Sequence, residues 1–171
     1  MTKVVENAFL SYGNPDAPVK VEVFLNLACP YCATFFEAAD EVLAPYIENN
    51  QVQYVIKHYD KPREMLLYGT LANLFFDYKE PERIYELMKD LFKKQSEWSE
   101  SDSDSIKKML TEQYGLKEEP DTIDISLQIT SEAIKRKVKM VPTVFINDKE
   151  FQFPVELDAL GLRDEVENAL A

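Results

Sequence analysis

Both cysteines of the chain lie in one tetrapeptide, Cys29-Pro30-Tyr31-Cys32, and no other feature constrains the fold and the chemistry as strongly. The tetrapeptide follows an apolar run at residues 19–27 and precedes residues 33–49, whose pattern is helical. A strand that leads directly into a helix through two cysteines places both sulfur atoms at the beginning of that helix. The spacing therefore predicts a dithiol that makes and breaks one disulfide.

The expected roles of the two cysteines follow from the chemistry of thiols. The thiolate is the attacking form, so one cysteine needs a lowered pKa. If the helix starts at or just after Cys29, that sulfur lies beside unpaired backbone N–H groups and the positive end of the helix dipole. Pro30 suits the first helical position, and Cys32 lies one turn on from Cys29. We therefore expect Cys29 to be the nucleophile and Cys32 the resolving thiol, with Tyr31 tuning the redox potential.

A static disulfide or one half of a metal site is the alternative interpretation of this pair. A zinc site made of cysteines needs four thiolates, and the single histidine, His58, would bring one chain to three ligands at most. We therefore favour redox chemistry and expect no metal and no cofactor. His58 stands alone at the end of an apparent strand, and we expect it to be structural or on the surface rather than a base.

Composition limits the size of the protein and its partners. A chain of 171 residues with 46% hydrophobic content suffices for one compact core, with room for a small subdomain. The formal net charge of −12 argues against nucleic acid or an anionic membrane surface as the main partner. Residues 1–14 lack the pattern of a secretory signal, and no apolar stretch is as long as a membrane span. We expect a cytoplasmic protein, although a mature exported protein recloned behind a new methionine would look the same.

The first third of the chain has the pattern of a βαβ unit. Residues 19–27 follow a turn-forming segment and are expected to be a central strand. Residues 34–47 carry apolar side chains at helical spacing, with Pro45 near the end. Residues 52–59 alternate between apolar and polar side chains, which suits a strand parallel to the first.

The middle of the chain, residues 62–137, has a helical pattern instead. We expect helices at 64–78, 82–94, 105–114 and 121–137, and an acidic, serine-rich loop at 96–105 in which Trp98 is buried. The stripe expected to form the apolar face of the last helix is Ile123, Leu127, Thr130, Ile134 and Val138. A hairpin at 143–153 and an amphipathic helix at 157–170 complete the chain. The order predicts an α/β fold in which residues 1–61 and 138–171 form one domain and residues 62–137 form an all-helical insertion.

Three motifs together carry a resemblance to a known family: residues 13–18 before a strand, the Cys29–Cys32 tetrapeptide, and Val141-Pro142-Thr143 before the hairpin. Over nearly its whole length the chain resembles the DsbA-like thiol-disulfide oxidoreductases of the thioredoxin superfamily. The tetrapeptide alone is shared with glutaredoxins, which are shorter and lack such an insertion. The resemblance implies a thioredoxin-like fold and disulfide exchange with protein or peptide thiols and disulfides. It also makes glutathione or a redox partner protein a candidate partner.

The resemblance also implies a cis peptide bond before Pro142, close to the cysteine pair. In the family, the backbone of the residue before this proline, here Val141, pairs with an extended substrate peptide. The candidate catalytic residues are thus Cys29 and Cys32, and the candidate substrate-binding residues are Pro30, Tyr31, Met140, Val141 and Pro142.

Two departures from the family pattern affect the expected mechanism. Met140 stands where many relatives have glycine, and its flexible apolar side chain is able to line the substrate groove. Relatives commonly carry a buried acid six residues before the first cysteine, where this chain has Val23. Glu22 is displaced by one residue, which points it to the opposite face of a strand. We therefore expect proton transfer at Cys32 to use water or another group.

The basic run near the end of the helix expected at 121–137, and the function of the whole chain, each have more than one interpretation. The basic run Lys135, Arg136, Lys137 and Lys139 either faces the cysteines or forms a solvated helix end that complements the helix dipole, and we favour the second. Besides a protein thiol-disulfide oxidoreductase, the chain could be a redox-gated thioredoxin-fold adaptor or, with weaker support, a glutathione-linked oxidoreductase. In a reducing cytosol, reductase or isomerase work is favoured over net oxidation.

Overall fold

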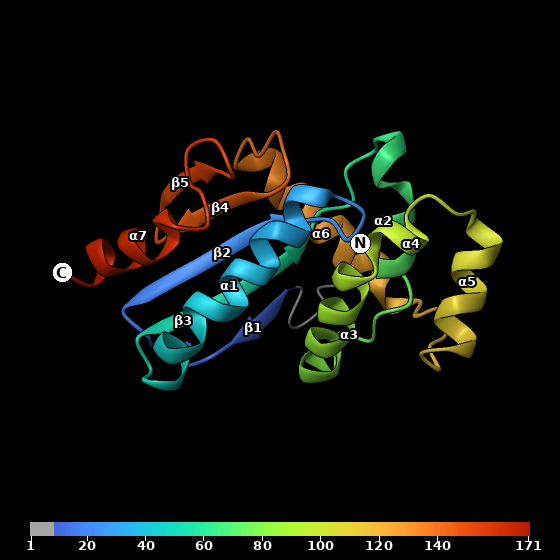
Figure 1. Cartoon of the computed structure of the whole chain (residues 1–171), viewed down its shortest axis with the longest axis horizontal. Helices are drawn as coiled ribbons and strands as arrows, with labels where there is room; N and C mark the ends of the chain where they lie inside the picture. The colour runs from blue at the N-terminus through green and yellow to red at the C-terminus, as the bar shows by residue number, and fades with distance from the viewer. Residues whose placement is uncertain (1–8) are drawn as a thin grey trace.

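The computed structural model describes residues 9–171, and within them the chain forms one five-stranded sheet with helices on both faces (Figure 1). The first half of the fold consists of strands β1 (Leu10–Tyr12) and β2 (Val19–Leu25), helix α1 (Pro30–Glu48) and strand β3 (Val52–His58). The last half consists of strands β4 (Thr143–Ile146) and β5 (Lys149–Gln152) and helix α7 (Gly161–Leu170). The predicted α/β, thioredoxin-like fold is confirmed.

The order of the strands in the sheet is β1-β3-β2-β4-β5, so β2 is central as expected. β2 and β3 run parallel, with Val19 opposite Val52 and Leu25 opposite His58, whereas the other neighbouring pairs are antiparallel. β1 was not predicted, because a strand of three residues gives almost no pattern. Its pairing with β3 makes the sheet one strand wider than the sequence indicated.

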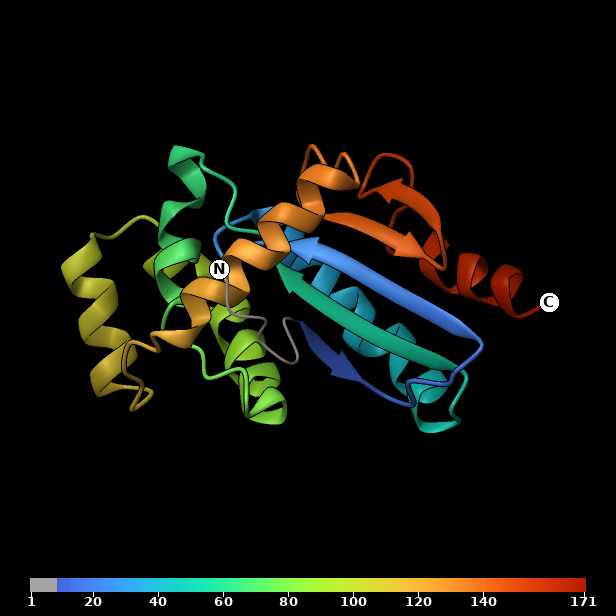
Figure 2. The same ribbon diagram turned by 180° about the vertical axis from the view of Figure 1, so that it is seen from behind.

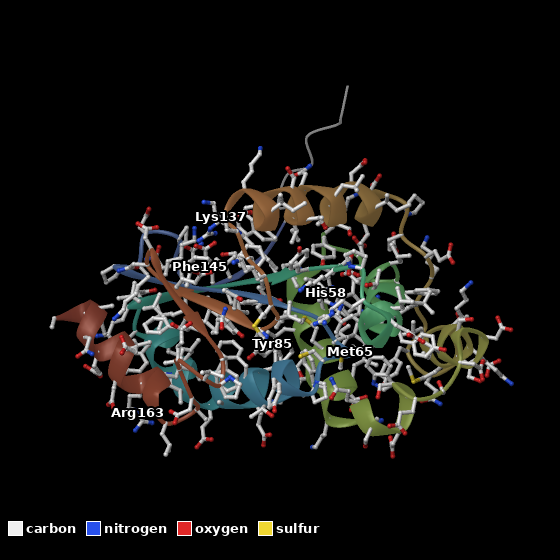
Figure 3. All side chains as sticks on the ribbon, turned by 90° about the horizontal axis from the view of Figure 1, so that it is seen from above. His58, Met65, Tyr85, Lys137, Phe145 and Arg163 are labelled. Carbon is white, nitrogen blue, oxygen red and sulfur yellow. The ribbon has the colours of Figure 1, made fainter. Side chains whose placement is uncertain are left out.

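The two faces of the sheet are covered by different helices. α1 and α7 lie on one face, and α6 (Asp121–Lys135) crosses the other, as the front and back views show (Figures 1 and 2). The view from above shows the same three layers edge-on (Figure 3). Since successive side chains of a strand alternate between faces, β2 directs Val21 and Val23 toward α1 and Glu22 toward α6.

The helical segment between β3 and β4 differs in its boundaries from the expectation. A 3-10 turn (Glu64–Leu66) leads into α2 (Leu67–Asn73), which ends five residues earlier than predicted, and Leu67 at its start is exposed. α3 (Pro81–Lys93) begins at the proline, one residue before the predicted start, and its buried residues are Ile84, Met88, Leu91 and Phe92. The remaining helices are α4 (Gln95–Trp98) and α5 (Ser103–Glu112).

Residues 95–98 therefore form a short helix where a loop was expected to begin. The Trp98 side chain is buried, as predicted, and its Nε1–H donates a hydrogen bond of 2.8 Å to the carbonyl of Leu91. The bond fixes α4 against the end of α3. It thereby orients Gln95, the first residue of α4, toward the interior.

The stripe expected to form the apolar face of α6 is wrong. Ile123, Leu127 and Ile134 are 54%, 56% and 65% exposed. The buried face is formed by Thr122, Ile125, Ile129 and Ala133. α6 has apolar residues on two sides, and the side that packs is the one in line with Glu132 and Arg136, which bind charged partners on the sheet.

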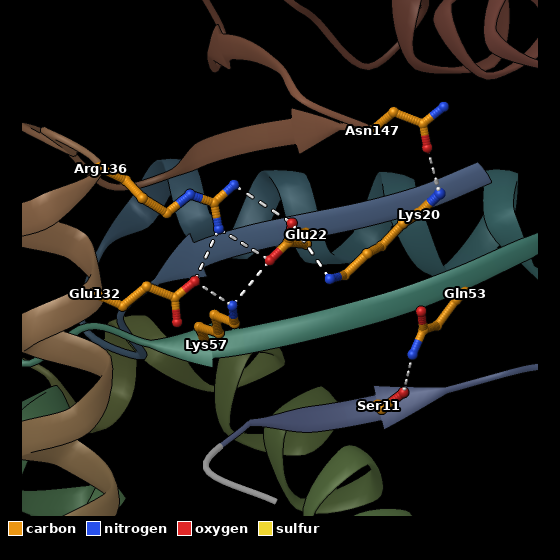
Figure 4. A network of polar contacts seen from close by, with 8 residues as sticks. All are labelled: Ser11, Lys20, Glu22, Gln53, Lys57, Glu132, Arg136 and Asn147. Atoms are coloured by element: carbon orange, nitrogen blue, oxygen red, sulfur yellow. Dashed lines mark hydrogen bonds and ion pairs between the residues drawn. The ribbon is translucent and has the colours of Figure 1, made fainter. Parts of the chain in front are cut away.

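Those partners form a cluster of four charged side chains, which we call the α6 ion cluster: Glu22 of β2, Lys57 of β3, and Glu132 and Arg136 at the end of α6 (Figure 4). The Lys57 Nζ lies 2.9 Å from Glu22 Oε2 and 2.6 Å from Glu132 Oε1. Arg136 Nη1 lies 3.1 Å from Glu22 Oε2 and 2.9 Å from Glu132 Oε1. Two positive and two negative charges therefore compensate each other between α6 and the sheet.

A Glu22→Gln variant is expected to lose about 3 kcal/mol of stability at pH 7, because Lys57 and Arg136 keep only one carboxylate between them. Burial alone would raise the pKa of Glu22, but hydrogen bonds and charge from Arg136 and Lys57 lower it overall. A carboxylate whose folded pKa lies below its unfolded value stabilises the fold above the unfolded pKa, and this contribution disappears as the pH falls through the folded pKa.

The difference in stability between wild type and Glu22→Gln should therefore shrink as the pH falls below about 4.3. Urea denaturation at pH 7, 5, 4 and 3 measures it. Glu118→Gln, at an exposed carboxylate of the helical segment, is the control and should match wild type throughout. A difference for Glu22→Gln that is as large at pH 3 as at pH 7 would contradict the expectation.

Candidate functional site

The cysteine pair lies at the beginning of α1. Cys29 is the N-cap residue, with extended backbone angles (φ −85°, ψ 122°), and Pro30 occupies the first helical position as predicted. The side chain of Cys29 is 6% exposed and that of Cys32 is fully buried, and both are free thiols. The first turn contains no acidic residue, so nothing in it offsets the positive end of the helix dipole.

The two thiols differ strongly in acidity. The Cys32 thiol donates a hydrogen bond to Cys29, and this is the largest cause that lowers the pKa of Cys29 to about 7. Burial acts in the opposite direction, whereas the backbone N–H groups of Cys32 and Tyr31 lower the pKa further. For Cys32, burial raises the pKa well above its ordinary value, and the neighbouring Cys29 raises it again. The helix start therefore favours a thiolate at Cys29 and a thiol at Cys32.

The residue that follows β2 also contacts the buried thiol. The backbone N–H of Asn26 lies 3.4 Å from Cys32 Sγ, and its side-chain Oδ1 accepts a bond of 2.9 Å from the N–H of Ala28. The backbone N–H of Cys29 donates to the carbonyl of Asn26 at 3.1 Å. Residues 26–29, which we call the cysteine loop, are thus a tight turn that brings both sulfur atoms to the end of the central strand.

The segment before β4 completes the site. The Cys29 thiol donates toward the carbonyl oxygen of Val141, with 3.7 Å between sulfur and oxygen, and the Val141–Pro142 peptide bond is cis. Pro142 is buried and Val141 is half-buried, whereas Met140 is 50% exposed. The structure therefore brings together Cys29, Cys32 and Val141, although 112 residues separate the first from the last.

The remaining candidate residues flank this centre on the surface. Pro30 is exposed, and Tyr31 is 59% exposed. An aromatic side chain held beside a reactive sulfur presents an apolar surface to whatever approaches that sulfur. Tyr31 and the flexible side chain of Met140 are the large exposed apolar residues adjoining the cysteine pair and Val141 in the sequence.

Two predictions about charged residues can be compared with the structure. Glu22 lies on the α6 face of the sheet, opposite to α1, as its one-residue displacement predicted, and its carboxylate binds Lys57 and Arg136. Of the basic run, Lys135, Lys137 and Lys139 are exposed. Arg136 turns inward to the α6 ion cluster, and its Cζ lies 3.9 Å from the centre of the Phe145 ring. The solvated helix end was thus the right interpretation of this run, except for Arg136.

Sequence reasoning undervalued His58, which is buried beside the cysteine loop (Figure 3). Its Nε2 accepts a hydrogen bond of 3.0 Å from the backbone N–H of Leu27, so the proton resides on Nδ1, which lies 2.9 Å from Asp60 Oδ1. Burial would raise the pKa of Asp60, but His58 and hydrogen bonds from Ser126 and Asn73 lower it overall. The sequence signal for this contact is the pair His58-x-Asp60 at the end of a buried strand, because an acid two residues after a histidine can orient its ring. The role of His58 is structural, as expected.

Sequence reasoning missed Gln95 altogether. Its side-chain Nε2 donates to the carbonyl of Leu27 at 2.7 Å and to the carbonyl of Cys29 at 2.9 Å. Nothing in the sequence around Gln95 signals this contact, because the partners lie 66 and 68 residues away.

Two classes of site have no support in the part of the chain that the structure describes. Between residues 9 and 171, no three His, Cys, Asp or Glu side chains are grouped so that they could hold a metal ion. Over the same residues, none of the helices combines the length and the apolar character needed to traverse a lipid bilayer.

Comparisons with known proteins agree with this geometry. A family model described as thioredoxin matches residues 6–162. A search of curated proteins finds no significant match. Among solved structures, a conserved protein of unknown function from Enterococcus faecalis V583 is 31% identical, with a TM-score of 0.84, and the match covers 92% of this chain and 89% of that one.

Two more distant structures share the fold. Proteus mirabilis ScsC in a transitional conformation is 21% identical with a TM-score of 0.76, and the match covers 96% of this chain and 74% of that one. Wolbachia pipientis α-DsbA1 is 16% identical with a TM-score of 0.71, over 98% of this chain and 92% of that one. Because the family model matches residues 6–162, which is most of the chain, this protein belongs to the thioredoxin family.

Proposed function

We propose that this protein is a protein thiol-disulfide oxidoreductase that exchanges disulfides through Cys29 and Cys32. One observation carries the proposal: Cys29 is the N-cap of α1, with its sulfur 3.7 Å from the Val141 carbonyl, and Cys32 is fully buried one turn further on. This arrangement lowers the pKa of Cys29 to about 7 and raises that of Cys32 well above its ordinary value. A thiol with a pKa near ambient pH is the best attacking group, because it combines a large thiolate fraction with high intrinsic nucleophilicity. The thioredoxin family and the DsbA-like fold support the same general class of activity.

In the reductive direction, the Cys29 thiolate attacks one sulfur of a substrate disulfide. A Cys29–substrate disulfide forms, and the other substrate sulfur leaves as a thiolate. Cys32 then loses its proton to water and attacks Cys29 Sγ, which releases the second substrate thiolate and leaves a Cys29–Cys32 disulfide. The substrate gains two electrons and the protein loses two. An external dithiol, or two thiols, restores the Cys29–Cys32 dithiol and is itself oxidised to a disulfide, and the same steps in reverse oxidise a substrate dithiol.

The proposed substrates are extended protein or peptide segments. The carbonyl of Val141 lies beside Cys29, where it can accept a hydrogen bond from the backbone of a chain that is added as a short strand. The exposed side chains of Tyr31 and Met140 offer apolar contact that does not depend on the substrate sequence. Backbone pairing together with adaptable apolar contact suits an enzyme that accepts many protein thiols and disulfides.

Reduction of insulin disulfides tests the proposal. With dithiothreitol as the electron donor, wild-type protein is expected to accelerate the precipitation of the insulin B chain, and a Cys29→Ser/Cys32→Ser double variant is not. Circular dichroism confirms that both proteins are folded. The proposal fails if wild type is no faster than the double variant, and equal capture of one partner protein by both would then assign the chain to the adaptor class.

A further inference from the structure

The cysteine loop leaves the sheet before α1 begins, so its peptide groups lack regular partners in strand or helix. Side chains supply several of these partners, and some of them come from the helical segment between β3 and β4. Gln95 of that segment binds the loop directly, Gly69 lies close to Asn26 and Ala28, and Asn73 and Ser126 act through Asp60. The residue that carries the reactive thiol is therefore held by a part of the chain that contributes no thiol of its own.

Gln95 makes the most direct of these contacts. Its amide is buried, with 9% of the residue exposed, and its Nε2 bonds both the Leu27 carbonyl and the Cys29 carbonyl. The Cys29 carbonyl also accepts the first bond of α1, from the N–H of Ala33 at 3.2 Å. One amide group thus links the end of the cysteine loop to the first turn of the helix.

His58 binds the other backbone polar group of Leu27. The Leu27 N–H donates to His58 Nε2 while the Leu27 carbonyl accepts from Gln95, so both backbone polar atoms of Leu27 are bound by side chains. Asp60 orients His58, and Asp60 accepts hydrogen bonds from Asn73 of α2 and Ser126 of α6. The cysteine loop is therefore bound by His58 on one side and by Gln95 on the other. Gln95 belongs to the helical segment, and His58 is connected to it through Asp60.

We propose that Gln95 is a positioning residue, through which the helical segment holds Cys29 at the start of α1 in its reactive arrangement. The inference rests on the proposed function, because it assigns a role to Gln95 only if Cys29 is the attacking thiol. Gln95 acts through its hydrogen bonds to the backbone carbonyls of Leu27 and Cys29.

The physical reason lies in how the Cys29 thiolate is stabilised. The N–H groups of Tyr31 and Cys32 point toward Cys29 Sγ and help to lower its pKa. Their stabilising effect depends on distance and direction, so it requires the Cys29 backbone to stay fixed relative to the first turn. Without the amide of Gln95, two buried carbonyls lose a donor and the loop is free to turn them toward water. The thiolate would then lose part of its stabilisation.

A Gln95→Met variant tests the proposal, because methionine has a similar length and no hydrogen-bond donor. The measurement is the rate at which iodoacetamide alkylates Cys29, followed by mass spectrometry of its peptide between pH 5 and 10. For wild type, the plot of alkylation rate against pH should have its midpoint, which is the pKa of Cys29, at about 7. The variant's midpoint should move toward the value of about 8.5 for free cysteine, so that alkylation at pH 6 slows several-fold.

Thr122→Val is the matched control. The Thr122 hydroxyl, also buried in the helical segment, donates its hydrogen bond to the Phe76 carbonyl at 2.8 Å and not to the cysteine loop. This variant should lose stability, as Gln95→Met does, but keep the wild-type midpoint. If Gln95→Met does not fold, Gln95→Asn replaces it, because the shorter amide cannot reach both carbonyls and should also raise the midpoint.

An unchanged midpoint in a folded Gln95→Met or Gln95→Asn protein overturns the proposal, and so does an equal shift in Thr122→Val. Since alkylation needs no disulfide substrate, this result is separate from the insulin assay. A wild-type protein with a midpoint near 7 and a shift in Gln95→Met, but no insulin reduction, overturns the proposed function and supports the positioning role alone.

Discussion

Replacing Cys29 by serine is expected to lower the rate of insulin reduction by about a thousandfold or more, to the level of the reaction without protein. A serine hydroxyl is not ionised near neutral pH and cannot form a disulfide, so neither the attack nor the mixed disulfide remains. The loss should not be accompanied by unfolding, because serine is close to cysteine in size and its hydroxyl can keep hydrogen bonds like those of Cys29. Circular dichroism and thermal unfolding check the fold.

The Cys32→Ser variant should lose turnover as well, but with a different covalent outcome. Cys29 still attacks, and without Cys32 the Cys29–substrate disulfide is not resolved. Non-reducing electrophoresis of the variant incubated with a disulfide-containing protein should therefore show an adduct that dithiothreitol removes, whereas Cys29→Ser should show none. Adducts that form on Cys29→Ser and not on Cys32→Ser would reverse the two assigned roles.

A Gly69→Ala variant is expected to lose about 3 kcal/mol of stability. A Cβ atom on Gly69 of α2 would lie 1.8 Å from Asn26 Oδ1 and 2.7 Å from the backbone nitrogen of Ala28. The Asn26 side chain could rotate away only by giving up its bond to Ala28, and the backbone nitrogen could move only with the cysteine loop. Insulin reduction should therefore fall together with stability.

Gly161→Ala is the control for this prediction. A Cβ atom there would meet only side-chain atoms, at 3.2 Å and 3.5 Å, and the change should stay within about 0.5 kcal/mol. Urea denaturation measures both variants. A Gly69→Ala protein with wild-type stability and activity would show that α2 does not press on the cysteine loop as tightly as these distances indicate.

The parts of the fold that could be predicted are those in which sequence neighbours are also neighbours in space. The start of α1 follows from Pro30 and the helical pattern after it, and the β4–β5 hairpin follows from a polar turn at Asn147 between two apolar runs. The parallel pairing of β2 and β3 follows because a strand-helix-strand order within one stretch of chain is the usual connection between parallel strands.

The predictions that failed concern β1 and the buried side of α6, which both depend on contacts that form only in the folded protein. β1 is too short to show a period, and it is recognisable only through its pairing with β3. α6 offers two apolar sides, and the buried side is selected by Thr122 and Ala133, which permit close packing, and by the ion pairs of Arg136. A hydrophobic pattern records which residues are apolar, and it does not record which of two apolar sides meets the sheet.

In the candidate site, too, the residues that could be predicted are those that belong to a local sequence motif. Cys29, Cys32 and Pro142 carry motifs that are visible in a few residues. His58 and Gln95 have no such motif, because their roles come from single hydrogen bonds to backbone atoms of residues far away in the sequence. Contacts between side chains and backbone leave little trace in composition or periodicity, since the partner can be any residue type.

The contact between Cys29 and Val141 has a consequence during synthesis. At a translation rate of about 5–20 residues per second, the 112 residues between them take roughly 6–22 seconds to follow Cys29 out of the peptidyl-transferase centre. Over that interval no Val141 carbonyl exists to lie beside Cys29. The dithiol is therefore made well before the backbone group that faces it, and the complete site forms only after residue 141 has been added.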